Sequence, residues 1–349
     1  MTNQSRLGNR GSQRTTASEV AQEAGVSLSA VSRVFTPGAS VSPRMRARVM
    51  EASQKLDYTP NVLARSLMTQ RTRLIGVILA NFSNPIYLTI LDHITRDMQQ
   101  RGLRALLLNI SNEDDLESMA QLVLQYSVDG LIVSAGAISP TITERCKKRN
   151  IPLVAFARQP KRGNLNVVCA DNVTGGRLAA RQFIDAGLQK LSFLAGPATA
   201  STSLDRGRGF TDELTEAGLS LHSQVHATFY DYNAGAEAAR HLLQVADKPD
   251  AIFCANDMLA FAVLDIARDE LGLKVPEDIS VIGFDDVNLS AGSAYNLSTI
   301  RQPVESMVTD TLDILGRQIE NWTGEWETRL HACSYIERGT VRKNRARQP

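Results

Sequence analysis

Polar residues recur at the ends of apolar runs in the body of the chain, and their types suit the binding of a small molecule. The runs are rich in Val, Ile and Leu and predict strands at 74–80, 105–110, 130–134, 151–157, 190–196, 251–256 and 279–284. At or beyond strand ends stand 81–87, Ser134, Arg158, Asp171, Asn256, Asp257, Asp285 and Asp286. Ligands bind beyond the carboxyl ends of parallel strands, so these residues predict one polar cleft. Each of them alone is more often a turn residue or a helix cap.

The chain lacks the sequence patterns of a catalytic or metal site. The five histidines are scattered without an HExxH spacing, and no GxSxG nucleophile motif is present. Residues 207–209 lack the third glycine of a dinucleotide fingerprint, and residues 195–202 lack the lysine of a phosphate loop. The four cysteines form no CxxC pair and are expected to be reduced thiols. We therefore expect no enzyme, no cofactor and no metal.

Helical stretches separate the apolar runs, for example at 172–186 and 235–245. This alternation predicts an α/β fold with parallel sheets and right-handed crossovers. No apolar run approaches the ~18–20 residues of a membrane span. Residues 1–13 are polar and basic, unlike a secretory signal. We therefore expect a cytoplasmic protein that does not contact a membrane.

Charge is distributed unevenly along the chain. The net charge is +1, but residues 1–73 hold eleven Lys and Arg against four Asp and Glu, a net charge of +7. The remaining residues then carry a net charge of −6. A basic N-terminal part on an acidic body indicates nucleic-acid binding at one end, although a solvated basic face would show the same excess.

Residues 16–35 have the pattern of two short helices joined by a turn. Ser18 can cap the first helix and Ser27 the second, and Gly25 between them suits a tight left-handed turn. The apolar residues that would let the two helices face each other are Val20, Ala21, Ala24, Val31 and Val34. This is the helix-turn-helix layout, which places its second helix in the major groove of DNA.

A third helix is expected from Ser42 and Pro43, a capping residue followed by Pro at the first helical position. Its apolar stripe is formed by Met45, Val49, Ala52 and Leu56. The arginines near its start, which could meet phosphates, are Arg44, Arg46 and Arg48. A further helix over 61–69 is too short to be stable alone, so we expect it to fold on DNA. Leu67 is its best candidate for an apolar wedge between base steps.

Two segments of this region resemble the lactose/galactose repressor (LacI/GalR) family: AxEAGVSxxxVSRVF and VSPxxRxRVxxAxxxLxYxPNxLARSL. The resemblance implies that base edges are read by Leu28, Ser29 and Arg33, and that phosphates are met by Ser27 and Ser32. It implies a hinge whose DNA-contacting residues are Asn61, Ala64, Arg65 and Leu67, the leucine entering the minor groove. Ala30 and Thr36 replace the Thr and Asn common in the family, which we expect to alter affinity rather than function.

The resemblance continues through the body, so it covers nearly the whole chain after Gln13. It rests there on ANFSNPIY (80–87), ADNVTGG (170–176), DRGRGF (205–210), CANDMLA (254–260), VPEDISVIGFDD (275–286) and TIRQP (299–303). It implies that Tyr87 lines the cleft and that Arg206 binds an oxygen-rich or anionic group. It also implies that Asn256 and Asp285 hydrogen-bond the ligand, with Asp171 nearby. The chain would cross between two lobes three times, the first holding 74–170 and 302–325, the second 171–301 and a final strand near 330–339.

The expected fold is an all-α helix-turn-helix head joined to an α/β two-lobed ligand domain with parallel sheets, like a periplasmic binding protein. The expected segments are a disordered tail (1–13), the DNA-binding domain (14–59), the hinge helix and linker (60–73), the ligand-binding and dimerisation domain (74–340) and a basic tail (341–349). A secreted sugar-binding protein would fit the body alone, but it needs a signal peptide and no head.

The expected function is that of a bacterial transcriptional regulator that binds a near-palindromic operator under the control of a small-molecule effector. Repression is expected, and activation stays open. A sugar or sugar acid is the leading effector, with a nucleobase and a phosphorylated sugar as alternatives. The other expected partner is a second copy of the chain, in a homodimer or a dimer of dimers.

Overall fold

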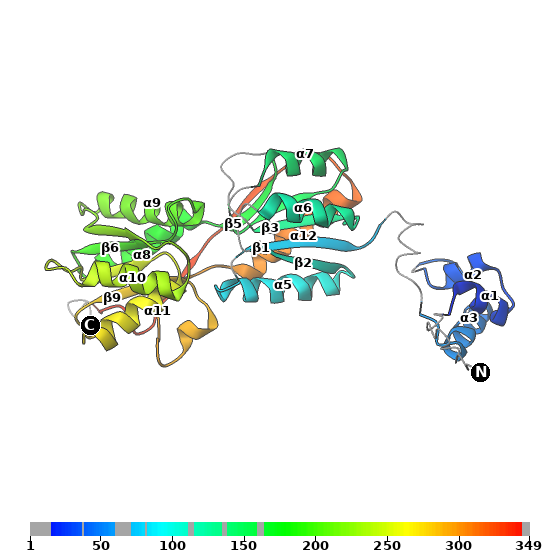
Figure 1. Cartoon of the computed structure of the whole chain (residues 1–349), viewed down its shortest axis with the longest axis horizontal. Coiled ribbons are helices and arrows are strands. Elements are labelled where there is room, and N and C mark those ends of the chain that lie inside the picture. Colours follow the sequence, from blue (N-terminus) through cyan, green and yellow to red (C-terminus); the bar gives the residue numbers. More distant parts are fainter. Residues whose placement is uncertain are drawn as a thin grey trace, which may run out of the picture. The chain divides into compact units, whose positions relative to one another are not determined.

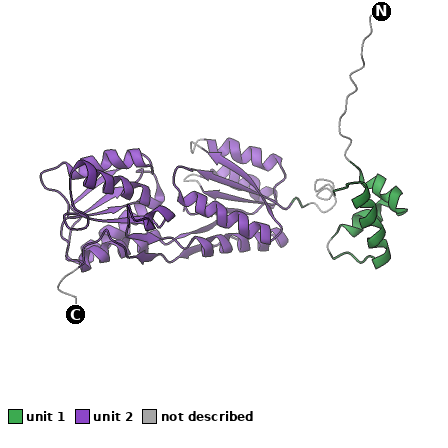
Figure 2. Cartoon of the chain, turned by 90° about the horizontal axis from the view of Figure 1, so that it is seen from below, with its two compact units in different colours: residues 1–72 green, residues 73–349 purple. Residues whose placement is uncertain are grey.

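A computed structural model describes residues 15–36, 38–59, 71–80, 82–110, 115–134, 138–158 and 164–343. The chain divides into two compact units, residues 1–72 and residues 73–349 (Figure 2). The expected hinge residues Asn61, Ala64, Arg65 and Leu67 lie outside the described residues, as do 1–13 and 344–349.

The described part of the first unit contains three helices, α1 (Ala17–Ala24), α2 (Leu28–Val34) and α3 (Pro43–Lys55). All three contribute to one core, formed by Val20, Ala21, Ala24, Val31, Val34, Val49 and Ala52. Gly25 ends α1 in the left-handed conformation (φ 58°), which Gly adopts without the steric cost of a Cβ atom. The short turn after it leads into α2, so the expected helix-turn-helix layout is confirmed.

Side-chain caps set where these helices begin. Thr16 caps α1, so the expectation for Ser18 was wrong: Oγ1 of Thr16 accepts from the backbone N–H of Glu19 (3.3 Å), and the Glu19 carboxylate accepts from the Thr16 N–H (2.7 Å). This reciprocal box requires an acidic or amide side chain three residues after the cap. Glu19 supplies it for Thr16, whereas Ala21 stands at that position after Ser18. The expected caps of α2 and α3 are present: Ser27 and Ser42.

Two arginines of α3 hold the other helices of the unit. Arg46 donates to the backbone carbonyl of Val34 at the end of α2 (3.1 Å), and Arg48 donates to that of Gly25 (3.3 Å). Cationic side chains at helix C-termini satisfy carbonyl groups and oppose the partial negative charge there. Within the unit these two arginines therefore have structural contacts, although Arg44, Arg46 and Arg48 are all exposed.

The second unit is built from two six-stranded sheets with helices on both faces, the first and second lobes (Figure 1). The sheet of the first lobe has the order β11-β5-β4-β3-β1-β2, and all its pairings are parallel. Its strands are β1 (Leu74–Ala80), β2 (Arg104–Ile110), β3 (Gly130–Ser134), β4 (Leu153–Phe156), β5 (Asn166–Ala170) and β11 (Thr328–His331). Its helices are α5 (Ile86–Gln100), α6 (Leu116–Gln125), α7 (Pro140–Lys148) and α12 (Val304–Glu320).

The sheet of the second lobe has the order β12-β10-β9-β8-β6-β7, with only the β10–β12 pairing antiparallel. Its strands are β6 (Leu191–Ala195), β7 (Ser223–His226), β8 (Ala251–Cys254), β9 (Ser280–Asp285), β10 (Thr299–Arg301) and β12 (Ser334–Ile336). Its helices are α8 (Asn172–Asp185), α9 (Ser201–Glu216), α10 (Tyr232–Leu243), α11 (Asp257–Asp265), the π-helical η2 (Ile266–Glu270) and the 3-10 helix η3 (Asn288–Ala291). The two-lobed architecture with parallel sheets is thus as expected.

The chain passes between the lobes after β5, after β10 and after β11. The expected final strand of the second lobe near 330–339 is present but short, because this segment forms two short strands in different sheets. Residues 328–331 pair with β5 in the first lobe, and residues 334–336 pair with β10 in the second. Among the residues that the structure describes, no helix has both the length and the apolarity needed to cross a bilayer.

Candidate functional site

A small pocket of about 30 Å³ lies between the lobes of the second unit. Both lobes line it, through Asn84, Ile86, Tyr87, Ile90, Ala157, Arg158, Thr202, Arg206, Tyr230, Asn256, Asp285 and Gln302. Arg158 follows β4, and Asp285 is the last residue of β9. The pocket therefore lies beyond the carboxyl ends of the strands, where parallel sheets bind ligands.

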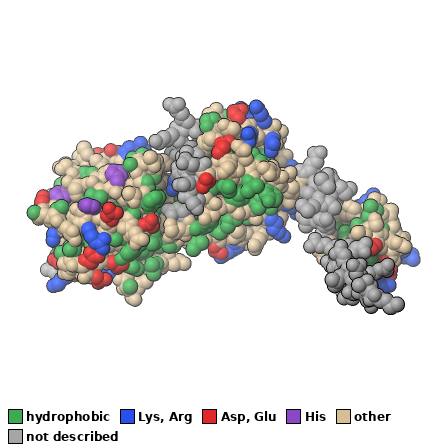
Figure 3. Space-filling view, in the orientation of Figure 1, with side chains coloured by type: hydrophobic (Ala, Val, Ile, Leu, Met, Phe, Trp, Pro, Cys, Tyr) green, Lys and Arg blue, Asp and Glu red, His purple; other side chains and the backbone are tan. Residues whose placement is uncertain are grey.

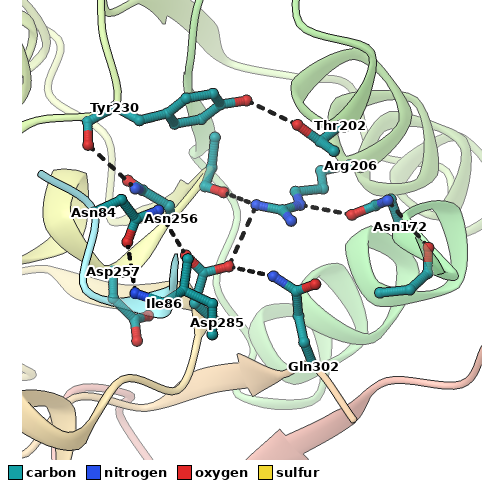
Figure 4. Close-up of polar contacts among 12 residues, drawn as sticks. Asn84, Ile86, Asn172, Thr202, Arg206, Tyr230, Asn256, Asp257, Asp285 and Gln302 are labelled. Carbon is teal, nitrogen blue, oxygen red and sulfur yellow. Dashed lines mark hydrogen bonds and ion pairs between the residues drawn. The ribbon is translucent and has the colours of Figure 1, made fainter. Parts of the chain in front are cut away.

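Arg206 on α9 is a buried cation held from several directions (Figure 4). Its Nε donates to Oδ1 of Asn172 (2.9 Å), and its Nη1 donates to the backbone carbonyl of Ala255 (2.5 Å). Nη1 also lies 3.8 Å from a carboxylate oxygen of Asp285. The guanidinium carbon is 3.5 Å from the centre of the Phe284 ring, which gives it an aromatic floor. The orientation of the guanidinium is thus fixed before any ligand binds.

Asp285 is the carboxylate of the pocket, and both lobes bond to it. Its Oδ1 accepts from Nε2 of Gln302 (2.6 Å), and its Oδ2 accepts from Nδ2 of Asn84 in the first lobe (3.2 Å). Burial raises the pKa of Asp285, while the Arg206 charge and these two hydrogen bonds act in the opposite direction. The Asn84–Asp285 hydrogen bond spans the cleft, so the side chains that line the pocket also connect the lobes.

Asn256 both lines the pocket and caps α11, so its two expected roles coexist. Its Oδ1 accepts from the backbone N–H of Leu259 (3.0 Å), which satisfies the first turn of the helix. Its Nδ2 is 3.5 Å from the Tyr230 carbonyl. Tyr87 is buried on the opposite wall, in the first turn of α5. The structure therefore brings Tyr87, Arg206, Asn256 and Asp285 to one pocket, while their contacts with a ligand stay predictions.

Asp171 does not line this pocket. Its carboxylate caps α8 by accepting from the backbone N–H of Thr174 (3.0 Å) and from the Thr174 hydroxyl (2.7 Å). The residue that reaches the site from this crossover is its neighbour Asn172, which holds Arg206. Asp171 stays outside the pocket because its side chain accepts hydrogen bonds at the start of α8, where backbone N–H groups have no partner within the helix.

Sequence reasoning missed several pocket residues as binding candidates. Thr202 and Tyr230 lie in segments with no strand-end signal, and their hydroxyl groups are 3.1 Å apart. Asn84 and Gln302 stood within the family-like segments 80–87 and 299–303 but were not singled out. Arg158 was noted only as a residue after a strand. Proximity to a strand end or to a family-like segment could therefore have identified Asn84, Arg158 and Gln302, but not Thr202 and Tyr230.

The first unit presents the expected DNA-reading residues on one helix. Leu28, Ser29 and Arg33 of α2 are exposed, with Leu28 at 52% exposure. Ser27 precedes them as the helix cap, and its hydroxyl lies 2.9 Å from that of Ser29. Ser32 is half-buried on the same helix. An exposed, mainly polar helix face with one apolar side chain suits major-groove readout.

A helix-turn-helix unit followed by two parallel-sheet lobes with a polar pocket between them defines a ligand-binding transcriptional regulator. Residues 16–61 match the family model "Bacterial regulatory proteins, lacI family", and residues 72–326 match "Periplasmic binding proteins and sugar binding domain of LacI family". The chain belongs to the LacI family of bacterial regulatory proteins, and it is a DNA-binding regulator rather than an enzyme.

Similar proteins span nearly the full chain. The transcriptional regulator DegA of Bacillus subtilis strain 168 is 32% identical, covering 87% of this chain and 91% of DegA. The ribose operon repressor of Escherichia coli K12 is 30% identical (93% and 99% covered), and the repressor PurR of Erwinia tasmaniensis is 31% identical (93% and 96%). A solved Lac repressor dimer, bound to operator and the anti-inducer ONPF, has a TM-score of 0.85 at 25% identity, covering 94% of this chain and 99% of that chain.

Proposed function

We propose that this chain is a cytoplasmic, homodimeric repressor whose binding to a near-palindromic operator is controlled by a sugar or sugar acid held between its lobes. The observation that carries the proposal is that a helix face suited to DNA and a buried polar pocket occur in one chain. The Lac repressor of similar fold was solved as a dimer on its operator, which supports the same assembly here. DNA as the partner supports a cytoplasmic location.

On DNA, α2 enters the major groove, where its side chains meet base edges. Leu28 packs on a thymine methyl group, because it cannot hydrogen-bond a base. Ser29 and Arg33 bond to base edges, and Ser27 and Ser32 bond to phosphates that set the position of the helix. Leu67, outside the described residues, enters a central minor-groove step at a cost of a few kcal/mol that bending and new contacts offset.

The first lobe offers a surface for the second copy of the chain. Apolar side chains gather on its visible face in Figure 3, and its exposed large apolar residues include Leu88, Leu107, Leu122 and Tyr126. Leu107 lies on β2, the edge strand of the sheet. Burial of such a patch against a second copy removes apolar area from water at about 25 cal/mol per Å².

The effector acts by changing the contacts between the lobes. A ligand that bonds Asp285 competes with Asn84, whose hydrogen bond to this carboxylate already spans the cleft. The ligand thus binds one arrangement of the lobes better than another and shifts the population. Couplings of this kind are typically ~1–3 kcal/mol, and they act reciprocally on ligand and DNA affinity.

A nucleobase is the second candidate effector. Its support is the PurR relative and the presence of two aromatic rings in the pocket, Tyr87 and Tyr230. The sugar class is favoured because most other lining groups are guanidinium, amide, hydroxyl and carboxylate groups, which bond hydroxyl-rich ligands.

Gel shifts at stated salt with the DNA upstream of the regulated and neighbouring genes test the proposal. We expect one fragment to bind at least ~10³-fold more tightly than scrambled DNA of equal length. A preference below about tenfold for every fragment would contradict operator recognition. Adding each sugar, sugar acid and nucleobase to the specific complex then identifies compounds that strengthen or release it.

A further inference from the structure

The charges around the pocket indicate the chemical class of the effector, an inference that rests on the proposed function. Two guanidinium groups and one carboxylate line the pocket, those of Arg158, Arg206 and Asp285, and their residues are 8%, 4% and 3% exposed. Among the described residues that line the pocket, the formal charge is therefore +1. The two guanidinium charges would attract a bound anion.

Arg206 is oriented as an anion receptor. Its Nε and Nη1 are occupied by Asn172 and by the Ala255 carbonyl, and the Phe284 ring lies against the guanidinium face. Within the described part of the chain, Nη2 makes no hydrogen bond (Figure 4). A guanidinium held in this way loses little freedom when it donates to an oxyanion.

The N-terminus of α9 adds a second attraction for negative charge at the same wall. No side chain caps this 16-residue helix, whose N-cap residue is Ala200. Thr202 in its first turn lines the pocket, and Arg206 lies one turn further along the same helix face. Uncapped N–H groups and the helix dipole favour an anion at this position.

Asp285 does not cancel this preference. Its carboxylate already accepts from Gln302 (2.6 Å) and Asn84 (3.2 Å), and it lies at 3.8 Å from Arg206 without a hydrogen bond to it. Burial raises the pKa of Asp285, and the charge of Arg206 and these two hydrogen bonds lower it. Asp285 thus remains an acceptor for hydroxyl groups at one end of the pocket.

We propose that the effector carries an oxyanion, a carboxylate or a phosphate ester, bound by Arg158, Arg206 and the first turn of α9. The rest of the effector carries hydroxyl groups that bond Asp285 and Asn256. Sugar acids and sugar phosphates have this combination, whereas neutral sugars and unsubstituted nucleobases lack the anion.

Titration calorimetry on the full-length wild-type protein, at fixed ionic strength in a chloride buffer, tests the charge requirement. The probes are two matched pairs, D-gluconate with D-glucose and D-ribose 5-phosphate with D-ribose, together with inorganic phosphate. We expect the anion of at least one pair to bind about tenfold or more tightly than its neutral partner, about 1.4 kcal/mol. Gluconate selectivity indicates a carboxylate, and selectivity for the two phosphates indicates a phosphate ester.

Two outcomes would overturn the inference: equal or tighter binding of both neutral sugars, or no binding of any anion at millimolar concentration. Arg158→Gln should reduce affinity for the selected anion about tenfold more than affinity for its neutral partner. Arg208→Gln is the matched control, because Arg208 lies exposed on α9, pairs with Asp205 (2.9 Å) and does not line the pocket. If anion selectivity fails while operator binding persists, only this inference falls; loss of operator binding would instead contradict the proposed function.

Discussion

At the scale of the residue, the side chain of Asp257 holds the turn that presents Asp285 to the pocket. Its Oδ2 accepts from the backbone N–H of Val287 (2.9 Å) and the hydroxyl of Ser290 (2.6 Å), and its Oδ1 accepts from the hydroxyl of Thr299 (2.5 Å). Asp285 has a positive φ (122°), a conformation that L-residues rarely adopt and that the surrounding bonds must maintain. A fully buried acid outside the pocket thereby determines the position of one inside it.

The titration of Asp257 predicts a pH dependence of stability. Burial, and then the charge of Asp285, raise the pKa of Asp257 from 3.8 to about 7. Between these values the folded state binds more protons than the unfolded state, so the contribution of this group is complete below pH ~3.8 and is lost as the pH rises toward ~7. The slope is at most about 1.4 kcal/mol per pH unit.

Urea unfolding between about pH 5 and 7 measures this effect. Asp257→Asn cannot titrate, so its free energy of unfolding should fall less with rising pH than that of the wild type. Asp250→Asn is the control, because the Asp250 carboxylate accepts from the backbone N–H groups of Gln189 and Lys190 at the surface. Equal pH slopes for wild type and Asp257→Asn would show that Asp257 does not titrate in this range.

A second prediction at this scale concerns Leu28 and DNA. Leu28→Ala removes the apolar contact with thymine, so the preference for operator over scrambled DNA should fall about five- to tenfold, with binding to scrambled DNA unchanged. Met50→Ala is the matched control, an exposed apolar residue (49%) on α3 of the same unit. Competition gel shifts measure both ratios, and an equal loss in the two variants would remove Leu28 from base reading.

At the scale of the element, α8 and α9 approach each other through glycines, and this approach places Arg206 beside Asn172. A Cβ atom on Gly176 would lie 2.1 Å from the carbonyl oxygen of Arg206, and one on Gly209 would lie 1.9 Å from that of Val173. Both obstacles are backbone atoms, which cannot move away as the end of a flexible side chain can. The two helices must therefore separate if either glycine is replaced.

Two glycine-to-alanine variants should consequently shift stability in opposite directions. Gly209→Ala should destabilise the protein by about 2–3 kcal/mol, because the added methyl group forces the helices apart. Gly316→Ala on α12 should stabilise it by about 0.5–1 kcal/mol, since a Cβ there meets nothing within 4 Å and alanine is the better helix former. Thermal unfolding compares them, and a tolerated Gly209→Ala would refute the close packing.

At the scale of the whole ligand-binding unit, the Asn84–Asp285 hydrogen bond connects lobes that the chain joins by three crossovers. Asn84 also orders the start of α5, because its Oδ1 accepts from the backbone N–H of Ile86 (3.2 Å). Loss of the Asn84 side chain should therefore destabilise the ligand-free arrangement of the two lobes.

Distances between spin labels test this prediction in Asn84→Ala, with one label on each lobe at Lys148→Cys and Glu237→Cys. The mean distance should lengthen or its distribution broaden relative to the labelled parent, and Leu88→Ala on α5 serves as control. The native thiols are buried, and burial raises the pKa of Cys146 to about 11 and that of Cys169 and Cys333 to about 12, so they react slowly with labels. An unchanged distribution in Asn84→Ala would show that this hydrogen bond does not hold the lobes.

Several strands were predictable because a short continuous apolar run in the sequence is typical of a strand that is buried on both faces of a sheet. β1 and β3 match their predicted ranges, and β9 is shifted by one residue. β7 was missed because it is a half-exposed edge strand of four residues with the sequence SQVH. β10 and β12 have only three residues each, too few for a periodic pattern.

By itself, the sequence determined the helix-turn-helix layout, the basic charge of its end of the chain and the parallel sheets, because caps, glycine turns and apolar runs act between residues close in the chain. Only the tertiary structure decided which polar side chains meet. Asn84 and Asp285 are 201 residues apart in the sequence, and their hydrogen bond depends on how two separately built sheets face each other. The same holds for Asp171, which looked equivalent to Asp285 as a residue after a strand. The start of α8 engages its carboxylate, whereas the turn held by Asp257 directs that of Asp285 into the pocket.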